Sequence, residues 1–181
     1  IQHCNGEILS KMNRWGDKER LAELISHIRA KVPGIILRTT LITGFPSETK
    51  EQFNELAEFV QEQRFDRLGC FAYSQEEGTR AAEFEDQVEE SVRSHRADII
   101  MEQQMFVSAE NNEKLMDKEL VAVVEGFDKF GECYFGRTEM DAPDIDGKVF
   151  FTSDNPLEIG DYVNIKITDT LDYDLIGEVI A

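Results

Sequence analysis

The sequence predicts an α/β fold, a partial parallel (β/α) barrel, followed by a small all-β barrel. Two observations predict this order. Apolar runs alternate with helical patterns up to about residue 117, which is the rhythm of βαβ units. From Lys118 onward the apolar period becomes two, and glycines separate short strands, as in a small barrel. We therefore place the domain boundary near Asp117, with domains at residues 1–117 and 118–181.

Each element of the first domain follows from its apolar pattern. Leucine and isoleucine at helical spacing predict an amphipathic helix over residues 18–31. An apolar, β-branched run predicts a strand over residues 35–43 that is buried on both faces. Thr49 and Gln52 form a capping box that begins a second helix. The other expected elements are strands over residues 1–4 and 67–73 and a long helix over residues 87–116.

Period-two alternation predicts the strands of the second domain. Val121 and Val123 alternate with Ala122 and Val124, and apolar residues at 163, 165 and 167 alternate with polar ones. Glycines at 126, 131, 147 and 160 separate the short strands. The dipeptide Asp146-Gly147 is a hairpin signal. We therefore expect a closed or nearly closed β-barrel of OB type.

Charge is the most informative bulk property. The chain has 19 basic and 37 acidic residues, a formal net charge of −18. From Lys118 onward there are 5 basic and 15 acidic residues, so the second domain carries −10. Such a surface repels a phosphate backbone and attracts a basic partner. A solvated surface without a charged partner is the alternative.

The cysteines and the hydropathy indicate the compartment. Cys4, Cys70 and Cys133 are far apart, and the odd count without a CxxC motif favours reduced cytosolic thiols over a disulfide framework. We expect them to be small buried hydrophobes. No apolar run is long enough to cross a membrane, and no signal-peptide pattern is present. We therefore expect a cytoplasmic protein without a membrane partner.

Polar residues stand where three predicted strands end. These ends are Gln2-His3, Thr43-Gly44 and Tyr73-Ser74, and ligands bind at the carboxyl ends of parallel strands. Gly44 would let the backbone approach a ligand. Arg38 within an apolar strand would be costly to bury without a carboxylate or ligand as its partner. A structural ion pair is the alternative for Arg38, and a hydrogen-bonded structural role is the alternative for His3.

Longer segments resemble a known enzyme family. IQHCNGEILSKMNRWGDKE, LRTTLITGFPSETKEQFNEL and FDRLGCFAYSQEEGT resemble the second half of the radical S-adenosylmethionine domain of methylthiotransferases. VAVVEGFDKFGECYFGRTEMDAPDIDGKVFF and GDYVNIKITDTLDYDLIGEV resemble the TRAM domain, an OB-like barrel, of the same enzymes. The motifs FAYSQEEGT and GRTEMDAPDIDG are most similar to the branch that methylthiolates an aspartate of small-subunit ribosomal protein S-twelve.

The resemblance implies a cofactor site for S-adenosylmethionine. The strand end at residues 42–46 would pack against the adenine, and Gly44 would permit that approach. Glu48 would be only an acid favoured near the positive end of the next helix dipole. The residues implied to contact the cofactor or its surroundings are Gln2, His3, Arg38, Thr40, Ile42, Gly44, Phe71, Tyr73 and Ser74.

The resemblance also implies two 4Fe–4S clusters in the full-length enzyme. Neither the CxxxCxxC motif nor the cysteines of the amino-terminal methylthiotransferase domain occur in these 181 residues. We therefore assign no catalytic residue and no metal ligand, and expect this chain alone to lack methylthiotransferase activity. Because it opens without Met and inside a strand pattern, we expect a fragment of a longer protein.

Three functions are compatible with the resemblance. In the favoured one, the acidic TRAM domain docks basic ribosomal protein S-twelve. In the second, the chain belongs to the tRNA-modifying branch and its aromatic residues hold RNA, although basic residues are few. In the third, it is a non-catalytic binding fragment. The candidate contacts with a basic protein substrate, all of which have turn formation as the alternative role, are Asp141, Asp144, Asp146, Asp172 and Asp174.

Overall fold

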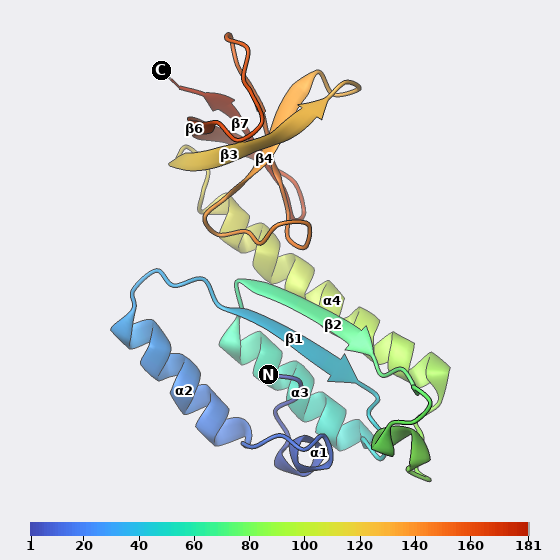
Figure 1. Cartoon of the computed structure of the whole chain (residues 1–181). Helices are drawn as coiled ribbons and strands as arrows, with labels where there is room; N and C mark the ends of the chain where they lie inside the picture. The colour runs from blue at the N-terminus through green and yellow to red at the C-terminus, as the bar shows by residue number, and fades with distance from the viewer. Residues whose placement is uncertain (181) are drawn as a thin grey trace. The chain divides into compact units, whose positions relative to one another are not determined.

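A parallel pair of strands, β1 (Arg38–Thr43) and β2 (Arg67–Ala72), forms the sheet of the first part of the chain. Their register runs from Arg38 opposite Arg67 to Thr43 opposite Ala72. Helix α3 (Lys50–Gln63) connects them, and it runs alongside β1 in Figure 1. The predicted βαβ order is therefore confirmed in the computed structural model, which describes residues 1–180.

The helices begin where the sequence places their caps. Helix α1 (Gly6–Lys11) is capped by Asn5, and α2 (Lys18–Lys31) is capped by Asp17. The predicted capping box of α3 is confirmed, with Thr49 and Gln52 each bonded to the other's backbone N–H. A 3₁₀ turn, η1 (Arg80–Glu83), and helix α4 (Glu90–Glu113) follow β2. Side-chain caps satisfy N–H groups that have no intrahelical partner.

Only one face of the β1–β2 sheet is buried. Leu41 and Cys70 lie on the covered face and pack with Phe59 and Ile100 in one apolar cluster. Along β1 exposed and buried residues alternate until the half-buried Ile42. The prediction of a strand buried on both faces over residues 35–43 is therefore wrong, because no helix of the described residues covers the second face.

The expected strand over residues 1–4 is not formed. The segment lies along β1, where the Ile42 N–H donates to the Gln2 carbonyl at 2.9 Å and the Thr39 hydroxyl donates to the Ile1 carbonyl at 3.2 Å. Because Asn5 caps α1 directly afterwards, the backbone turns away before a ladder can develop. The segment nevertheless stays next to the carboxyl end of β1.

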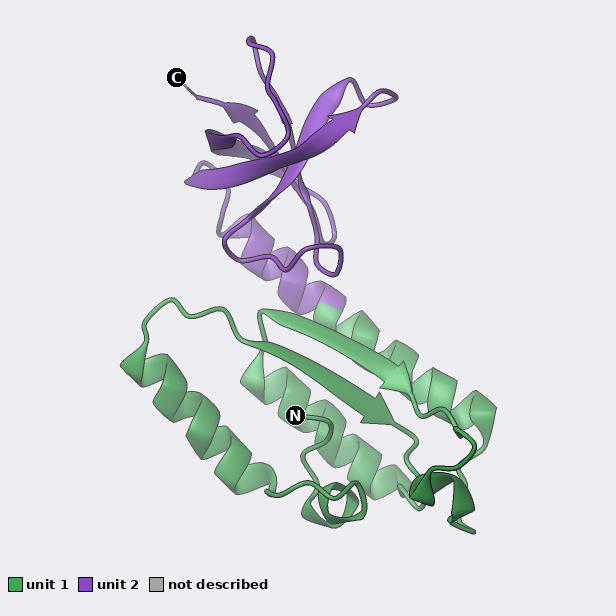
Figure 2. Cartoon of the chain, viewed as in Figure 1, with its two compact units in different colours: residues 1–104 green, residues 105–181 purple. Residues whose placement is uncertain are grey.

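The chain divides into two compact units, residues 1–104 and a second unit that begins at Met105 (Figure 2). The division falls inside α4, so the second unit contains the end of this helix as well as the β-strands. Within residues 1–180, no helix is both long and apolar enough to span a membrane.

The second unit contains a closed five-stranded barrel, as predicted. The strands are β3 (Glu119–Asp128), β4 (Cys133–Thr138), β5 (Val149–Thr152), β6 (Tyr162–Thr170) and β7 (Leu175–Val179). Their order around the barrel is β3-β4-β5-β7-β6, and only the β5–β7 pair is parallel. Closure leaves no unpaired sheet edge.

The barrel interior follows from the period-two pattern. Ala122 and Val124 of β3 and Ile165 and Ile167 of β6 are almost fully buried. Gly136 is required where β4 meets β3, because a Cβ there would lie 2.0 Å from the Val123 carbonyl oxygen. Alternation thus places one side of each strand in the core.

The hairpin signal at Asp146-Gly147 does not form a two-residue turn. It lies within residues 139–148, which connect the antiparallel strands β4 and β5. Gly147 is packed instead against the neighbouring connection, since a Cβ there would lie 2.0 Å from the Tyr173 carbonyl oxygen. The dipeptide therefore serves a close backbone approach between two loops.

Replacing the capping threonine of α3 tests the contribution of the capping box. Thr49→Ala removes the hydroxyl that accepts from the Gln52 N–H. We expect a loss of about 1 kcal/mol in the free energy of unfolding, measured by urea denaturation. The control is Thr152→Ala at an exposed strand position, where a change within about 0.5 kcal/mol is expected. Equal effects of the two substitutions would contradict a stabilising cap.

Candidate functional site

The turn after β1 is shaped by its contact with α4. Gly44 has φ +68°, and a Cβ on it would lie 2.2 Å from Cγ of Arg93. Glycine is therefore needed here for conformation and for space. The sequence suggested bare backbone open to a ligand at Gly44, but a protein side chain packs there instead.

Arg93 connects the ends of the two strands. Its Nη1 donates to the Tyr73 carbonyl at 2.7 Å, and its guanidinium lies 5.8 Å from the centre of the Tyr73 ring. The Thr43 hydroxyl donates to the Arg93 carbonyl at 3.2 Å. The carboxyl edge of the sheet is thus held against α4 by one residue that the sequence analysis did not single out.

A buried carboxylate lies beneath this turn. Glu48 Oε1 accepts from the Gly44 N–H at 3.0 Å and from Arg96 Nη1 at 2.6 Å. The side chain of Glu48 is 0% exposed and that of Arg96 is 11% exposed. Arg96 also donates to the Glu48 carbonyl at 3.1 Å. The interpretation of Glu48 as only a helix-start acid is therefore wrong, because it is the paired acceptor that organises the turn.

His3 belongs to the same buried group. Its Nδ1 accepts from the Asn5 N–H at 2.9 Å, which leaves Nε2 to carry the proton, and Nε2 lies 3.3 Å from Glu48 Oε2. The ring is fully buried. These contacts favour the structural role of His3 over contact with a cofactor.

A pocket of about 740 Å³ opens at the carboxyl edge of the sheet, and we call it the edge pocket. Gln2 and Ile42, two of the predicted cofactor residues, line it together with Phe45. The Phe45 ring packs edge-on against Tyr73 at 5.3 Å and against Phe84 at 6.3 Å. Three basic residues also line the pocket: Lys11, Arg14 and Arg80. The arrangement combines apolar surface for a flat ring with positive charge for an anion.

Four other predicted residues lie on the uncovered face of the sheet or just beyond it. Arg38 and Thr40 are exposed on the same side of β1 as Ile42, and Phe71 stands opposite Ile42 and is 62% exposed. Arg38 is therefore exposed, and the cost of burying its charge does not arise on this open face. Ser74 is exposed and donates to Glu76 at 2.6 Å.

Tyr73 lies between the open edge and the interior. Its ring is half-buried against Phe45 and Arg93. Its hydroxyl is buried and has no hydrogen-bond partner among the described residues. A buried hydroxyl without a partner is costly, but Tyr73 is not among the residues that line the edge pocket.

The cysteines do not fit an iron–sulfur cluster. Cys4 and Cys70 are buried in the apolar core, and burial raises the pKa of each thiol to about 12. Cys133 is partly exposed, and desolvation and Asp128 raise its pKa. Within residues 1–180 no group of three potential ligands lies together. The described residues therefore offer no ligand set for such a cluster.

Three of the five candidate aspartates of the barrel hold its connecting loops by hydrogen bonds. Asp141 is buried and accepts from the Thr138 hydroxyl at 2.7 Å. Asp146 accepts from the Ala142 N–H at 2.7 Å, and Asp174 accepts from the Lys148 N–H at 2.7 Å. For Asp141 and Asp146 the alternative role in turns is favoured, whereas Asp174 joins two connections of the barrel.

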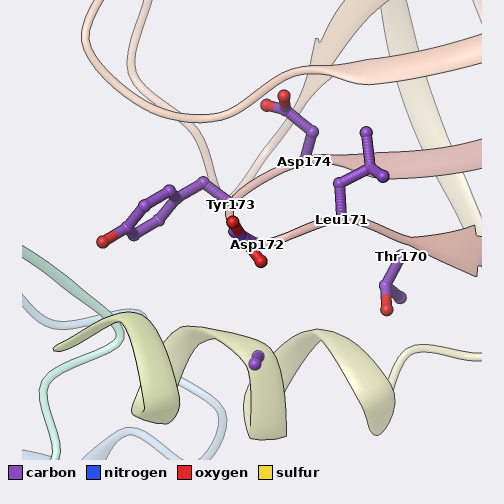
Figure 3. A pocket seen from close by; sticks show the side chains of 6 residues that line it. Thr170, Leu171, Asp172, Tyr173 and Asp174 are labelled. Atoms are coloured by element: carbon purple, nitrogen blue, oxygen red, sulfur yellow. The ribbon is translucent and has the colours of Figure 1, made fainter. Parts of the chain in front are cut away.

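Asp144 and Asp172 are the two candidate aspartates that are exposed. Asp172 and Tyr173 extend from the connection between β6 and β7, as Figure 3 shows. With Thr170 and Ala109 they line an open groove of about 590 Å³. This groove lies within the second unit and offers a carboxylate to solvent.

The five-stranded barrel matches a known domain family. A family model described as "TRAM domain" matches residues 118–180, which include all five strands of the barrel. The second unit therefore carries a TRAM domain.

Similarity to curated proteins covers nearly the whole chain. It is 48% identical to "Ribosomal protein uS12 methylthiotransferase RimO" of Geotalea uraniireducens, over 99% of this chain and 40% of that protein. The proteins of the same name from Geobacter sulfurreducens and Acetivibrio thermocellus are 48% and 46% identical, over 100% and 99% of the chain. The resemblance to methylthiotransferases is thus confirmed. The chain spans about 40% of the length of these relatives.

Removal of one partner of the buried ion pair tests its place in the structure. Arg96→Leu would leave the Glu48 carboxylate buried without its cation. We expect a loss of about 3–5 kcal/mol in the free energy of unfolding, measured by urea denaturation. The control is Lys18→Met, which breaks the more exposed pair with Glu62 at 3.9 Å and should cost less than about 1 kcal/mol. A small loss for Arg96→Leu would show that water or relaxation compensates Glu48.

Proposed function

We propose that this chain is part of a radical S-adenosylmethionine enzyme that methylthiolates an aspartate of ribosomal protein uS12. The observation that carries this proposal is an identity of 43–48% with relatives that have this activity in their name, over 98–100% of the chain. Such similarity includes the βαβ unit and the TRAM domain together. A cytoplasmic location follows from the proposed substrate.

The edge pocket is the proposed cofactor site. Ile42 and Phe45 offer apolar surface to an adenine ring, and the amide of Gln2 can donate to and accept from a ribose or a base. The ring of Tyr73 packs against Phe45 and supports that apolar surface. When bound beside a reduced cluster, S-adenosylmethionine supplies a 5′-deoxyadenosyl radical. Arg38, Thr40 and Phe71, on the open face of the sheet, would lie toward the substrate.

The clusters would be held by residues outside this chain. We therefore expect the 181-residue chain to form no 5′-deoxyadenosine after reconstitution with iron, sulfide and a reductant, measured by liquid chromatography and mass spectrometry. Two of its three cysteines are buried with raised pKa values, which opposes cluster ligation. Product above the level of a protein-free control would overturn this expectation. Binding of S-adenosylmethionine without cleavage would distinguish an enzyme part from a scaffold.

The TRAM domain is the proposed docking site for the protein substrate. Its formal charge of −10 attracts a basic protein, and Asp144 and Asp172 have carboxylates exposed to solvent. Asp141, Asp146 and Asp174 would contribute chiefly by holding the loops that present them. Electrostatic attraction of this kind depends on salt.

One observation favours the tRNA-modifying branch as a second candidate. Phe127, Phe130, Phe135 and Phe150 line a groove of about 480 Å³ together with Lys129 and Lys148. Aromatic rings can stack on unpaired bases, and lysines can meet phosphates. The 15 acidic residues of the domain oppose a polyanion, so the protein substrate remains the first proposal.

A salt-series titration tests which substrate is docked. We expect the chain to bind purified uS12 with an affinity that falls as salt increases, and not to bind a tRNA anticodon stem-loop. Asp144→Lys or Asp172→Lys should weaken binding of uS12 about three- to tenfold, because an attraction becomes a repulsion. Fluorescence anisotropy measures both ligands.

The matched control is Glu23→Lys, the same charge change at an exposed position of α2. It should leave the affinity for uS12 nearly unchanged. An equal loss for Glu23→Lys would indicate only a net-charge effect. Binding of the stem-loop instead of uS12 would make the tRNA-modifying branch the better proposal.

A further inference from the structure

The cations of the edge pocket are unusual in this chain. Lys11 lies at the end of α1, Arg14 lies in the connection to α2, and Arg80 begins η1. Two segments, residues 11–14 and the start of η1, therefore bring three positive charges to one pocket of a chain with net charge −18. Such a gathering is not expected from a surface that is acidic in general.

None of these cations forms an ion pair with a carboxylate in the described part of the chain. Lys11 donates to the hydroxyl of Ser47, in the turn that follows Gly44. This contact holds α1 beside the turn and keeps the ammonium at the pocket. Three cations that share one pocket repel one another, so an anion between them would stabilise the arrangement.

The proposed cofactor alone does not supply that charge. S-adenosylmethionine has a sulfonium, an ammonium and a carboxylate, and its net charge is therefore positive. Beside three cations it requires a further anion for electrical balance. The substrate of the proposed reaction has one, because the modified side chain is an aspartate.

We infer that Lys11, Arg14 and Arg80 form a subsite of the edge pocket that binds the side-chain carboxylate of the target aspartate. This inference rests on the proposed function and adds the group that selects the residue. Guanidinium groups bind carboxylates through paired hydrogen bonds, and the ammonium of Lys11 adds a point charge. All three cationic side chains are exposed, so the binding energy comes from the number of charges and their hydrogen bonds and not from burial.

The subsite explains how an acidic enzyme surface accepts an acidic residue. The TRAM domain would attract the basic protein as a whole, whereas the edge pocket reverses the sign of the charge locally. An asparagine in place of the aspartate would leave the three cations without their anion. The enzyme would therefore reject the amide although its shape is nearly the same.

The test is a two-dimensional NMR titration of the uniformly ¹⁵N-labelled chain in the presence of saturating S-adenosylmethionine. The probes are N-acetyl-aspartate N-methylamide and N-acetyl-asparagine N-methylamide. We expect the aspartate probe to shift the amide resonances of residues 10–14 and 80–81, and the asparagine probe to leave them in place. Arg14→Gln should weaken binding of the aspartate probe about five- to tenfold.

The control variant is Lys31→Gln, which removes an exposed charge at the end of α2 and should leave the affinity unchanged. An unchanged pattern of dispersed resonances confirms that each variant is folded. Equal shifts by the two probes, or none by either, would overturn the subsite while binding of S-adenosylmethionine upheld the proposed function.

Two further outcomes separate the possible sources of the carboxylate. In the first, Arg14→Gln weakens binding of S-adenosylmethionine but not binding of its decarboxylated analogue. In that case the cations hold the cofactor's own carboxylate, and the assignment to the substrate is wrong. If the aspartate probe binds while S-adenosylmethionine does not, the subsite stands and the proposed cofactor site fails.

Discussion

The buried pair of Glu48 and Arg96 is the interaction on which the first unit depends. Glu48 connects the turn after β1, the beginning of α3 and the segment of His3, and Arg96 connects them to α4. A carboxylate with no exposed surface is tolerated only when its partners satisfy it. Three segments that are distant in the sequence, those of His3, Glu48 and Arg96, must therefore meet before the site exists.

The edge pocket is a consequence of that alignment. With the turn held, Gly44 packs on Arg93, and Phe45 lies between Tyr73 and Phe84. Lys11 reaches the same turn from α1 through Ser47. Apolar rings and basic groups thus come together at one strand end, where parallel sheets place their ligands.

In the TRAM domain the same residue type has two roles. Asp141 and Asp174 satisfy backbone N–H groups that the barrel connections leave without strand partners. Asp172 makes no such hydrogen bond among the described residues and remains exposed at the surface. The net charge is therefore a property of composition, but the number of carboxylates that a partner can reach is decided by the hydrogen bonds of the loops.

The sequence by itself determined the local elements: the capping box at Thr49, the order of β1, α3 and β2, and the period-two strands of the barrel. These depend on neighbours within a few residues, so pattern and propensity suffice. The tertiary structure alone decided that β1 is covered on one face, that Arg93 occupies the space beside Gly44, and that Glu48 is buried. Glu48 and Arg96 are 48 residues apart, and no local pattern pairs them. Such pairing follows from packing and desolvation, which act only when the whole unit has assembled.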